Sequence, residues 1–387
     1  MREALGSLAR ICYGKSPAEV LSVDGEVPVI GTGGIYASAT RALYERGVIV
    51  ARKGSLGTPH LMKRPFWPSD TTFALLPNNG VDLDWLYFNL LNFDLTKLNE
   101  ATGVPSIGRE WLAKVKFLRL EQPEQQRIAA ILTSLDNAIE ATEALIDKHQ
   151  QIKAGLVHDL FKLSAGAPNI QPRGYPSGWR VLPLRSCLSE GASNGIYKPP
   201  HLIGSGALLI GQTALTKDRS IDPSLARRAV VSPEDLRRFG LAPGDILVAR
   251  VFATISGVGR PALVPELDEA AVFESNMMRL RADAKIIRPK LLFEWLKSDV
   301  SRRHIEGRAN ASNQVSVNQG VLYPLEVPVP PLDEQDRMVA EIEAADTARV
   351  AAIAVLEKLR MQRIGLMQDL LTGKVRVPMP ATETAAA

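Results

Sequence analysis

The sequence predicts an α+β protein in which two mixed α/β globular domains are joined by two long antiparallel coiled-coil helices with internal pseudo-twofold symmetry. Three observations predict this architecture. One stretch of the chain occurs twice, both copies carry a heptad pattern, and short β-type runs broken by Gly, Pro and Asn precede each copy. The length of 387 residues is enough for two or three domains.

The repeat is the most direct of these observations. Residues 124–161 align without a gap onto residues 334–371, and 13 of the 38 pairs are identical. The offset is a constant 210 residues, so that Asp136 corresponds to Asp346. An internal repeat of this kind indicates that one structural unit has been duplicated.

Both copies are predicted to be long helices. Apolar residues step by alternating threes and fours through each copy and form a heptad seam, which polar residues interrupt at a few positions. Pro123 can occupy the first turn of the first helix, Asp333 can cap the second, and Gly373 can end it. A single helix would leave its apolar stripe in water, so we expect the two copies to pair, in antiparallel orientation.

The repeat and the β-type runs divide the chain into six segments. These are a first globular domain (1–120), a first spacer helix (121–163), a linker (164–178), a second globular domain (179–330), a second spacer helix (331–373) and a flexible tail (374–387).

Composition narrows the class of protein. The net charge of +4 is too small to indicate a partner by itself. No apolar run reaches the roughly 18 residues of a membrane helix, and the N-terminus has no apolar signal core. Cys12 and Cys187 lie in separate halves and give no framework for disulfides or a zinc site. We therefore expect a cytoplasmic protein with no metal and no cofactor.

Motifs that carry catalysis are missing from the sequence. The glycine cluster at 31–34 lacks a third spaced glycine and a following helix pattern, so it does not indicate a nucleotide site. The sequence contains no Asn/Asp-Pro-Pro-aromatic motif, no Gly-x4-Gly-Lys-Ser/Thr loop and no Glu-x-Lys. We expect no catalytic residues and no enzymatic activity, and an enzyme of unrecognised type is a minor alternative.

Two globular domains that alternate with two duplicated helices resemble the plan of the specificity subunits of type I restriction-modification systems. The family's recognition-domain signatures are resembled by IGTGGIYASA (30–39), IVARKGSLGTP (49–59) and PFWPSDTTFAL (65–75). Its helix-entry motif is resembled by QPEQQRI (122–128) and PLDEQDRM (331–338). In the second domain PSGWRVLPL (176–184) resembles the usual opening strand, and the equivalents of RKGSLG and PFWPSDTT are expected, blurred, in ARVFATISGVGRP (249–261).

The resemblance implies a DNA sequence-specificity subunit without an active site. Each globular domain would be a target recognition domain that reads one half of a split target in double-stranded DNA through the major groove. The paired helices would set the unread spacer and dock two methyltransferase (modification) subunits, which recruit translocase-nuclease (restriction) subunits. The alternative is a stand-alone DNA-binding protein, such as a repressor or decoy.

Candidate DNA-binding residues are polar, basic or glycine residues in predicted loops. In the first domain they are Gly33, Gly34, Tyr36, Arg52, Lys53, Ser55, Lys63 and Arg64. In the second domain they are Gln212, Thr213, Arg250, Arg260, Asn276, Asn310, Ser312, Asn313 and Gln314. Repeated helix residues, expected on exposed faces, are the candidate partner-binding set: Glu124, Gln125, Arg127, Asp159, Glu334, Gln335, Arg337 and Asp369.

Overall fold

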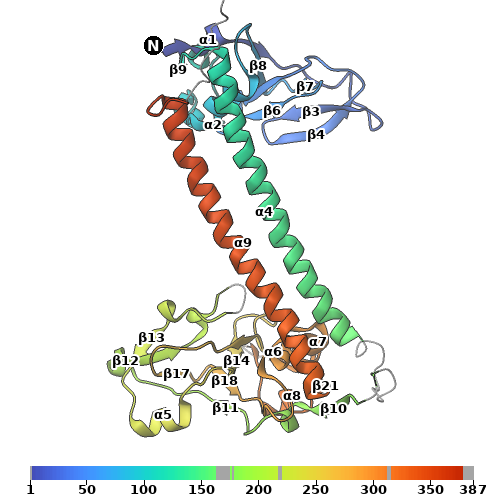
Figure 1. The fold of residues 1–387 in the computed structure, drawn as a ribbon, viewed down its shortest axis with the longest axis vertical. Coiled ribbons are helices and arrows are strands. Elements are labelled where there is room, and N and C mark those ends of the chain that lie inside the picture. Colours follow the sequence, from blue (N-terminus) through green and yellow to red (C-terminus); the bar gives the residue numbers. More distant parts are fainter. Residues whose placement is uncertain (1, 163–174, 177, 217–219, 312–314, 378–387) are drawn as a thin grey trace, which may run out of the picture. The chain divides into compact units, whose positions relative to one another are not determined.

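The chain folds into two compact units, each of which is described by itself. The computed structural model describes residues 2–162, 175–176, 178–216, 220–311 and 315–377. One unit comprises Met1–Leu145 with Ala351–Ala387, and the other comprises Ile146–Val350. Each unit therefore holds one globular domain and part of each long helix (Figure 1). The expected linker at 164–178 lies almost entirely outside the described residues.

The first globular domain combines sheets of four, three and two strands in its described residues. Their orders are β2-β8-β5-β6, β4-β3-β7 and β1-β9. The strands are β1 (Arg2–Ala4), β2 (Ala9–Tyr13), β3 (Val27–Gly31), β4 (Gly34–Ala39), β5 (Gly47–Ala51), β6 (His60–Met62), β7 (Trp67–Pro68), β8 (Thr72–Pro77) and β9 (Lys116–Leu118). The helices are α1 (Leu5–Leu8), α2 (Leu83–Asn92) and α3 (Arg109–Lys114), with a 3-10 turn at Leu95–Leu98.

The second globular domain has the corresponding sheets and one more. Their orders are β11-β18-β14-β16, β13-β12-β17, β10-β21 and β15-β20-β19. The strands are β10 (Arg180–Pro183), β11 (Ser193–Asn194), β12 (Ile203–Ile210), β13 (Arg227–Ala229), β14 (Ile246–Ala249), β15 (Val251–Phe252), β16 (Pro261–Leu263), β17 (Ala271–Phe273), β18 (Met277–Leu280), β19 (Asn310–Ala311), β20 (Val315–Ser316) and β21 (Glu326–Val329). The helices are α5 (Pro233–Phe239), α6 (Pro289–Lys297), α7 (Asp299–Arg308) and α8 (Gln319–Leu322), with 3-10 turns at Leu184–Cys187, Pro200–Leu202, Gln212–Ala214 and Pro223–Leu225.

The two domains share one topology. In each, a four-stranded antiparallel sheet accompanies a three-stranded sheet whose central strand has a parallel neighbour, β7 on β3 and β17 on β12. This parallel pairing makes β17 the counterpart of β7. The expectation that the counterpart of PFWPSDTT lies within 249–261 is therefore wrong, because β17 follows at 271–273 after a longer connection.

The core of each domain continues onto the long helices. In the first unit Trp85 and Leu86 of α2 share a core with Ile128 and Leu132 of the first long helix. Each of these side chains is buried, and such burial contributes about 1.5–3 kcal/mol for a large apolar side chain. The second domain packs its core in the same way against the second long helix, which contributes Met338.

The long helices are α4 (Gln122–Lys162) and α9 (Leu332–Thr372), each 41 residues long. Their bounds lie within one residue of the expected spacer helices at 121–163 and 331–373. The heptad positions are buried or half-buried along α4 from Ile128 to Leu156 and along α9 from Met338 to Leu370, whereas most positions between them are exposed. None of the described helices combines the length and the apolar character needed to cross a bilayer.

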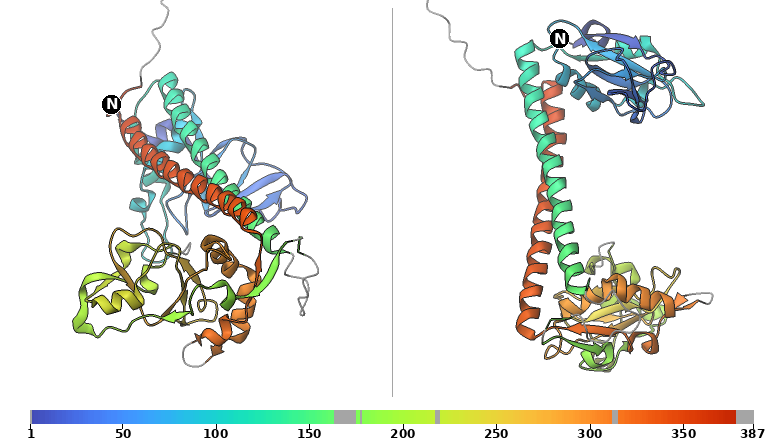
Figure 2. Two further views of the ribbon diagram at one scale, coloured as in Figure 1. Left: turned by 60° about the horizontal axis from the view of Figure 1, so that its bottom comes forward. Right: turned by 90° about the vertical axis from the view of Figure 1, so that its right-hand side faces the viewer.

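Within the first unit the two helix segments lie side by side and run in opposite directions (Figure 2). Glu124 of α4 pairs with Arg376 just beyond α9 at 2.6 Å, and Asp136 of α4 pairs with Arg363 of α9. The partner's number falls as the number on α4 rises, which defines an antiparallel pair.

The second unit has an ion pair of the same kind. The Nζ atom of Lys153 on α4 lies 2.7 Å from a carboxylate oxygen of Asp346 on α9. Lys290 of α6 also donates a hydrogen bond to this carboxylate, at 2.8 Å. Burial alone would raise the pKa of Asp346, but the hydrogen bonds from the two lysines outweigh it and hold this pKa below its usual value.

The C-terminal end of α9 matches the sequence prediction only in part. Gly373 ends the helix with φ +76°, a left-handed conformation that favours glycine. The flexible tail was expected to begin at residue 374. This expected start is too early, because Arg376 pairs with Glu124 and Val377 is buried in the core of the first domain. Residues 378–387 of that expected tail lie outside the described residues.

Candidate nucleic-acid interface

In the first domain, three loops meet at one end of the four-stranded sheet. The backbone N–H of Arg52, after β5, donates to the carbonyl oxygen of Thr71, after β7, at 2.8 Å. The ring of His60, at the start of β6, is hydrogen-bonded to the carbonyl oxygen of Thr32 in the β3–β4 turn at 3.2 Å. Residues 31–36 and 69–71 together line a pocket of about 390 Å³.

The β3–β4 turn presents two of the candidate residues. Gly34 has φ +106°, a backbone conformation that is strained for a residue with a side chain. Gly33 is exposed and has open space where a Cβ would lie. Tyr36 is 58% exposed. Partial burial and the nearby Asp70 carboxylate raise the pKa of Tyr36, so its hydroxyl remains a neutral hydrogen-bond donor and acceptor.

The loop after β5 carries the basic residues of this end. The guanidinium of Arg52 lies 5.5 Å from the ring centroid of Tyr13, at the end of β2. Arg109 approaches the same ring at 5.9 Å. Lys53 and Ser55 are exposed. Sequence reasoning missed Tyr13 and Arg109, and the available signal was an aromatic residue at the last position of a strand.

Lys63 and Arg64 lie elsewhere. They follow Met62, which pairs with Gly47 at the far end of β5 from Arg52. Lys63 also forms a 2.7 Å ion pair with Asp84 of α2. The structure therefore separates these two candidates from the group around Arg52.

The second domain brings a counterpart group together. Arg250 follows β14 as Arg52 follows β5, and its N–H donates to the carbonyl oxygen of Asn276 at 2.9 Å. The side chain of Gln212, after β12, donates to the carbonyl oxygen of Val251. Thr213 beside it is exposed.

Two polar atoms of this group are buried without a partner. They are Nε of Arg250 and Oδ1 of Asn276, neither of which has a hydrogen-bond partner among the described residues. Buried polar atoms are nearly always paired, so these two are candidate hydrogen-bonding groups for a polar partner.

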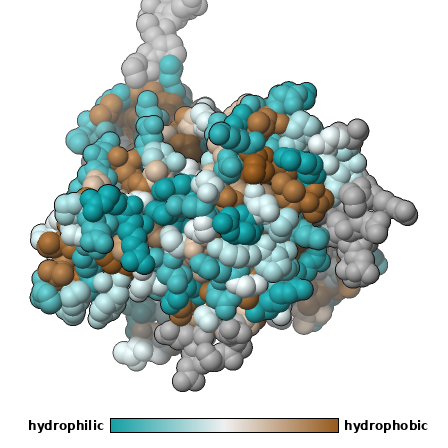
Figure 3. Space-filling view, turned by 90° about the horizontal axis from the view of Figure 1, so that it is seen from below, coloured by the Kyte–Doolittle hydropathy of each residue, from teal (hydrophilic) through white to brown (hydrophobic). Residues whose placement is uncertain are grey.

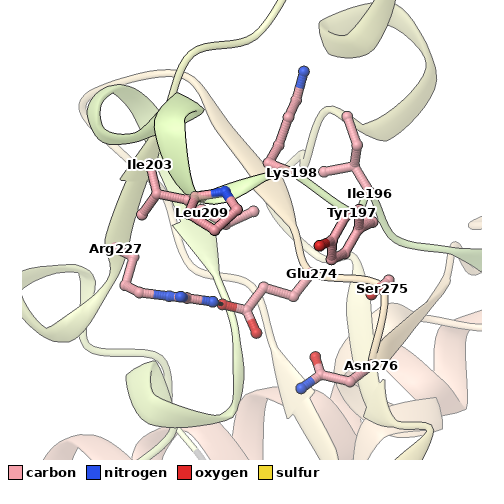
Figure 4. A pocket seen from close by; sticks show the side chains of 10 residues that line it. Ile196, Tyr197, Lys198, Ile203, Leu209, Arg227, Glu274, Ser275 and Asn276 are labelled. Atoms are coloured by element: carbon pink, nitrogen blue, oxygen red, sulfur yellow. Dashed lines mark hydrogen bonds and ion pairs between the residues drawn. The ribbon is translucent and has the colours of Figure 1, made fainter.

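A pocket of about 510 Å³ adjoins Asn276 (Figure 4). Tyr197 at its rim is 75% exposed, and Arg227 points across it to Glu274, donating from Nε at 3.1 Å. In the first domain the counterparts of Glu274 and Asn276 are Ser69 and Thr71, which line the pocket there. The loop at Ser69–Thr71 and its equivalent at Glu274–Asn276 therefore contribute different side chains to the two pockets, whose other lining residues come from segments that do not correspond.

The remaining candidates of the second domain are only partly described. Arg260 is exposed, and its Nε donates to the carbonyl oxygen of Ser256 at 2.7 Å. Asn310 begins β19, whose partner is β20. Ser312, Asn313 and Gln314 lie outside the described residues. On the face shown in Figure 3, hydrophilic and hydrophobic residues are interspersed, which suits a polar partner better than a large apolar one.

The expectation that the candidate partner-binding residues are exposed is wrong for three of them. Gln125, Gln335 and Glu124 are 3%, 0% and 5% exposed. Each glutamine sits at the start of a long helix with its side chain turned into its own domain, and Glu124 is held by Arg376.

The glutamine contacts are the same in both copies. The Oε1 atom of Gln125 accepts from the N–H of Asp82 at 2.8 Å, and that of Gln335 accepts from the N–H of Arg288 at 2.8 Å. Each Nε2 atom donates to two carbonyl oxygens, one of them five residues earlier in the chain. The glutamines thus fasten each domain to its helix. Their repetition in the sequence had suggested instead that they belong to an exposed partner-binding surface.

The other members of that set differ in accessibility. Arg127 and Arg337 are exposed. Glu334 is half-buried and accepts from the indole N–H of Trp179 at 3.1 Å. Asp369 pairs with Lys374 at 3.3 Å. The side chain of Asp159 lies outside the description.

Comparison with known proteins agrees with this arrangement. Residues 3–151 match the family model described as "Type I restriction modification DNA specificity domain". The chain is 22% identical to the type I restriction enzyme MjaVIII specificity subunit of Methanocaldococcus jannaschii, over 96% of this chain and 92% of that protein.

Solved structures show the same fold. The S subunit of a type I restriction-modification system from M. genitalium matches 98% of this chain and 96% of its own with a TM-score of 0.61 at 15% identity. A second structure, from work on complex assembly and conformational transition of the type I R-M system, matches 97% of this chain and 98% of its own with a TM-score of 0.55 at 14% identity.

The fold and the family match resemble those of the DNA specificity components of restriction-modification systems. More particularly, residues 3–151 match a type I restriction-modification DNA specificity domain, and nearly the whole chain is similar to type I specificity subunits.

Proposed function

We propose that each globular domain reads one half of a bipartite DNA target through the major groove. The observation that carries this proposal is that the two domains share a topology, and place polar loops at the same end of it, but differ in the side chains of those loops. One fold that presents two different polar surfaces is suited to reading two different half-sites, because base edges in the major groove are distinguishable.

The residues divide into two roles under this proposal. Arg52 and Arg250 occupy equivalent positions and suit contacts to phosphate or guanine. The positions that differ, Thr71 against Asn276 and Thr32 against Gln212, suit sequence readout, since asparagine and glutamine can bind adenine through two hydrogen bonds.

The helices act as the spacer in this proposal. We infer that α4 and α9 form one antiparallel coiled coil with pseudo-twofold symmetry, which holds recognition domains of residues 1–120 and 179–330 a fixed distance apart. The buried and half-buried heptad positions and the ion pairs in both units support this inference. The spacing of two half-sites then follows from the geometry of the protein.

The partners follow from the same assignment. Two methyltransferase subunits dock on the repeated surface that includes Arg127 and Arg337, and restriction subunits join through them. The chain itself contributes recognition and no catalysis, and it works in the cytoplasm, where the DNA is. A stand-alone repressor or decoy would bind DNA without a methyltransferase partner, so co-purification separates these two functions.

Selection of DNA by the full-length chain from a randomised duplex library tests the proposal. We expect two short sequence blocks separated by an unread gap of constant length. Affinity for the selected duplex should fall at least tenfold between 50 and 200 mM salt, because phosphate contacts dominate such binding and a few of them suffice for this loss. A single contiguous block, or no enrichment at all, would reject the proposal.

A further inference from the structure

Two ion pairs between the long helices are copies of each other. Asp136 and Asp346 are equivalent in the repeat, and so are Arg363 and Lys153. In the first unit Asp136 of α4 meets Arg363 of α9, and in the second unit Asp346 of α9 meets Lys153 of α4. The residue numbers of each pair add up to 499, so both pairs correspond to the same alignment of one helix against the other.

We propose that these two ion pairs fix the register of α4 against α9 and thereby set the distance between the two DNA-reading domains. The proposal rests on the function proposed above for its second half only, because the register of the helices does not depend on what the domains bind. All four residues act as positioning residues and need not touch DNA.

The partial burial of these charges supports the proposal. The side chains of Lys153, Asp346, Arg363 and Asp136 are only 20–34% exposed. Arg363 and Lys153 occupy heptad seam positions, where apolar residues would pair in many registers. A charged residue in the seam is stable only opposite its partner, because an unpaired, partly buried charge is costly.

Slipped registers would separate the charges. A slide by one heptad places Asp136 opposite Leu356 in one direction and opposite Leu370 in the other. The same slide places Asp346 opposite Ile146 in one direction and opposite Leu160 in the other. In each slipped register both aspartates would therefore lie opposite apolar residues. This disfavours the slipped registers relative to the observed one.

The consequence for DNA spacing is large. A slide of seven residues moves one helix along the other by about 10 Å at ~1.5 Å per residue. This distance corresponds to about three base pairs of DNA at ~3.4 Å each.

The ion pair of the second unit also couples this register to its recognition domain. Glu294 of α6 is 1% exposed and lies 3.0 Å from Nζ of Lys153. Lys290 of the same helix binds Asp346. A change in register would therefore break contacts to α6 as well as the pair itself.

The register can be measured without DNA in the full-length chain. Spin labels at the exposed positions Glu140 and Lys358, in a Cys12→Ser, Cys187→Ala background, report the distance between the helices within the first unit. We expect one narrow distance in the parent. Asp136→Arg, which opposes Arg363, should add a second population or shift the distance.

Two further variants make the result specific. The double variant Asp136→Arg, Arg363→Asp restores the charge pair and should restore the single distance. Glu143→Arg makes the same charge change at an exposed pair with Arg360 and should leave the distance unchanged. A single unaltered distance in Asp136→Arg would overturn the proposal.

DNA duplexes with selected half-sites and spacers changed by up to three base pairs test the second half. We expect Asp136→Arg to lose at least fivefold of the parent's discrimination between spacers and the charge-swapped variant to regain it. Unchanged discrimination in Asp136→Arg would overturn the link from register to spacing. A parent that prefers no spacer would instead overturn the proposed function, and the spin-label result would stand independently.

Discussion

The two globular domains differ most where they face solvent and least where they join the long helices. Both fasten their helix with a buried glutamine, Gln125 or Gln335, that bonds three backbone groups of its own domain. At the sheet end that carries the candidate DNA-binding loops, Thr71 corresponds to Asn276. The comparison teaches that the duplicated unit kept its junctions and changed its loops.

The junction between domain and long helix nevertheless differs in one side chain between the two domains. Counting from the backbone N–H groups that the two glutamines bind, Phe88 of α2 occupies the position that Glu294 occupies in α6. Phe88 is 2% exposed and Glu294 1% exposed. The first domain fills this position with an apolar ring, whereas the second places there a carboxylate surrounded by lysines.

The largest effect is expected from removing the glutamines. Gln125→Ala and Gln335→Ala should each lower the free energy of unfolding by about 3 kcal/mol, because buried backbone groups lose their partners at about 1–3 kcal/mol each. Urea unfolding followed by circular dichroism measures this loss. Gln126→Ala, at an exposed neighbouring position, is the matched control. Clearly unequal losses for the two glutamines would break the equivalence of the junctions.

The next effect sharpens the contrast at Glu294. Glu294→Gln should cost about 2 kcal/mol of unfolding free energy, since Lys153 and Lys297 lose a buried charged partner. Glu269→Gln makes the same change at an exposed pair with Arg228 and should cost much less, because solvent screens an exposed ion pair. Calorimetry of both variants decides the matter, and equal costs would argue that Glu294 carries no special role in the second domain.

The smallest effect concerns the repeated surface. Charge reversal at Arg127 and Arg337 (Arg127→Glu, Arg337→Glu) should weaken assembly with the methyltransferase subunits about tenfold per site, roughly 1.4 kcal/mol, while the helices stay folded. Analytical ultracentrifugation with the partner subunit measures assembly, and circular dichroism monitors the helices. Assembly at parental strength would place the docking surface elsewhere.

The long helices were predictable because their signals are local and repeated. The heptad seam, the glycine that ends α9 and the constant offset all lie in the printed sequence, and α4 and α9 begin and end within one residue of the expected bounds. The polar seam residues were visible too. Their partners were not, because a seam position does not say which residue of the other helix faces it.

The candidate site was predictable as a set of loops and less so as a group. Arg52 and Thr71 meet because β5 and β8 are antiparallel neighbours, a pairing that no local pattern specifies. Lys63 looked equivalent to Arg52 in sequence but follows a strand that runs the other way. Gln125 looked like an exposed helix-entry residue, and only the packing of Asp82 beside it explains its burial.

The central claim is that each domain reads one half-site. It is tested most directly by comparing the DNA sequences that the parent and two single-domain variants select. DNA is selected from a randomised library by the parent, by Arg52→Ala and by Arg250→Ala, and the information content of each sequence block is compared. The account predicts that each variant weakens a different block and leaves the other block and the gap unchanged. Loss of information in the same block for both variants, or equally across both blocks, would contradict it.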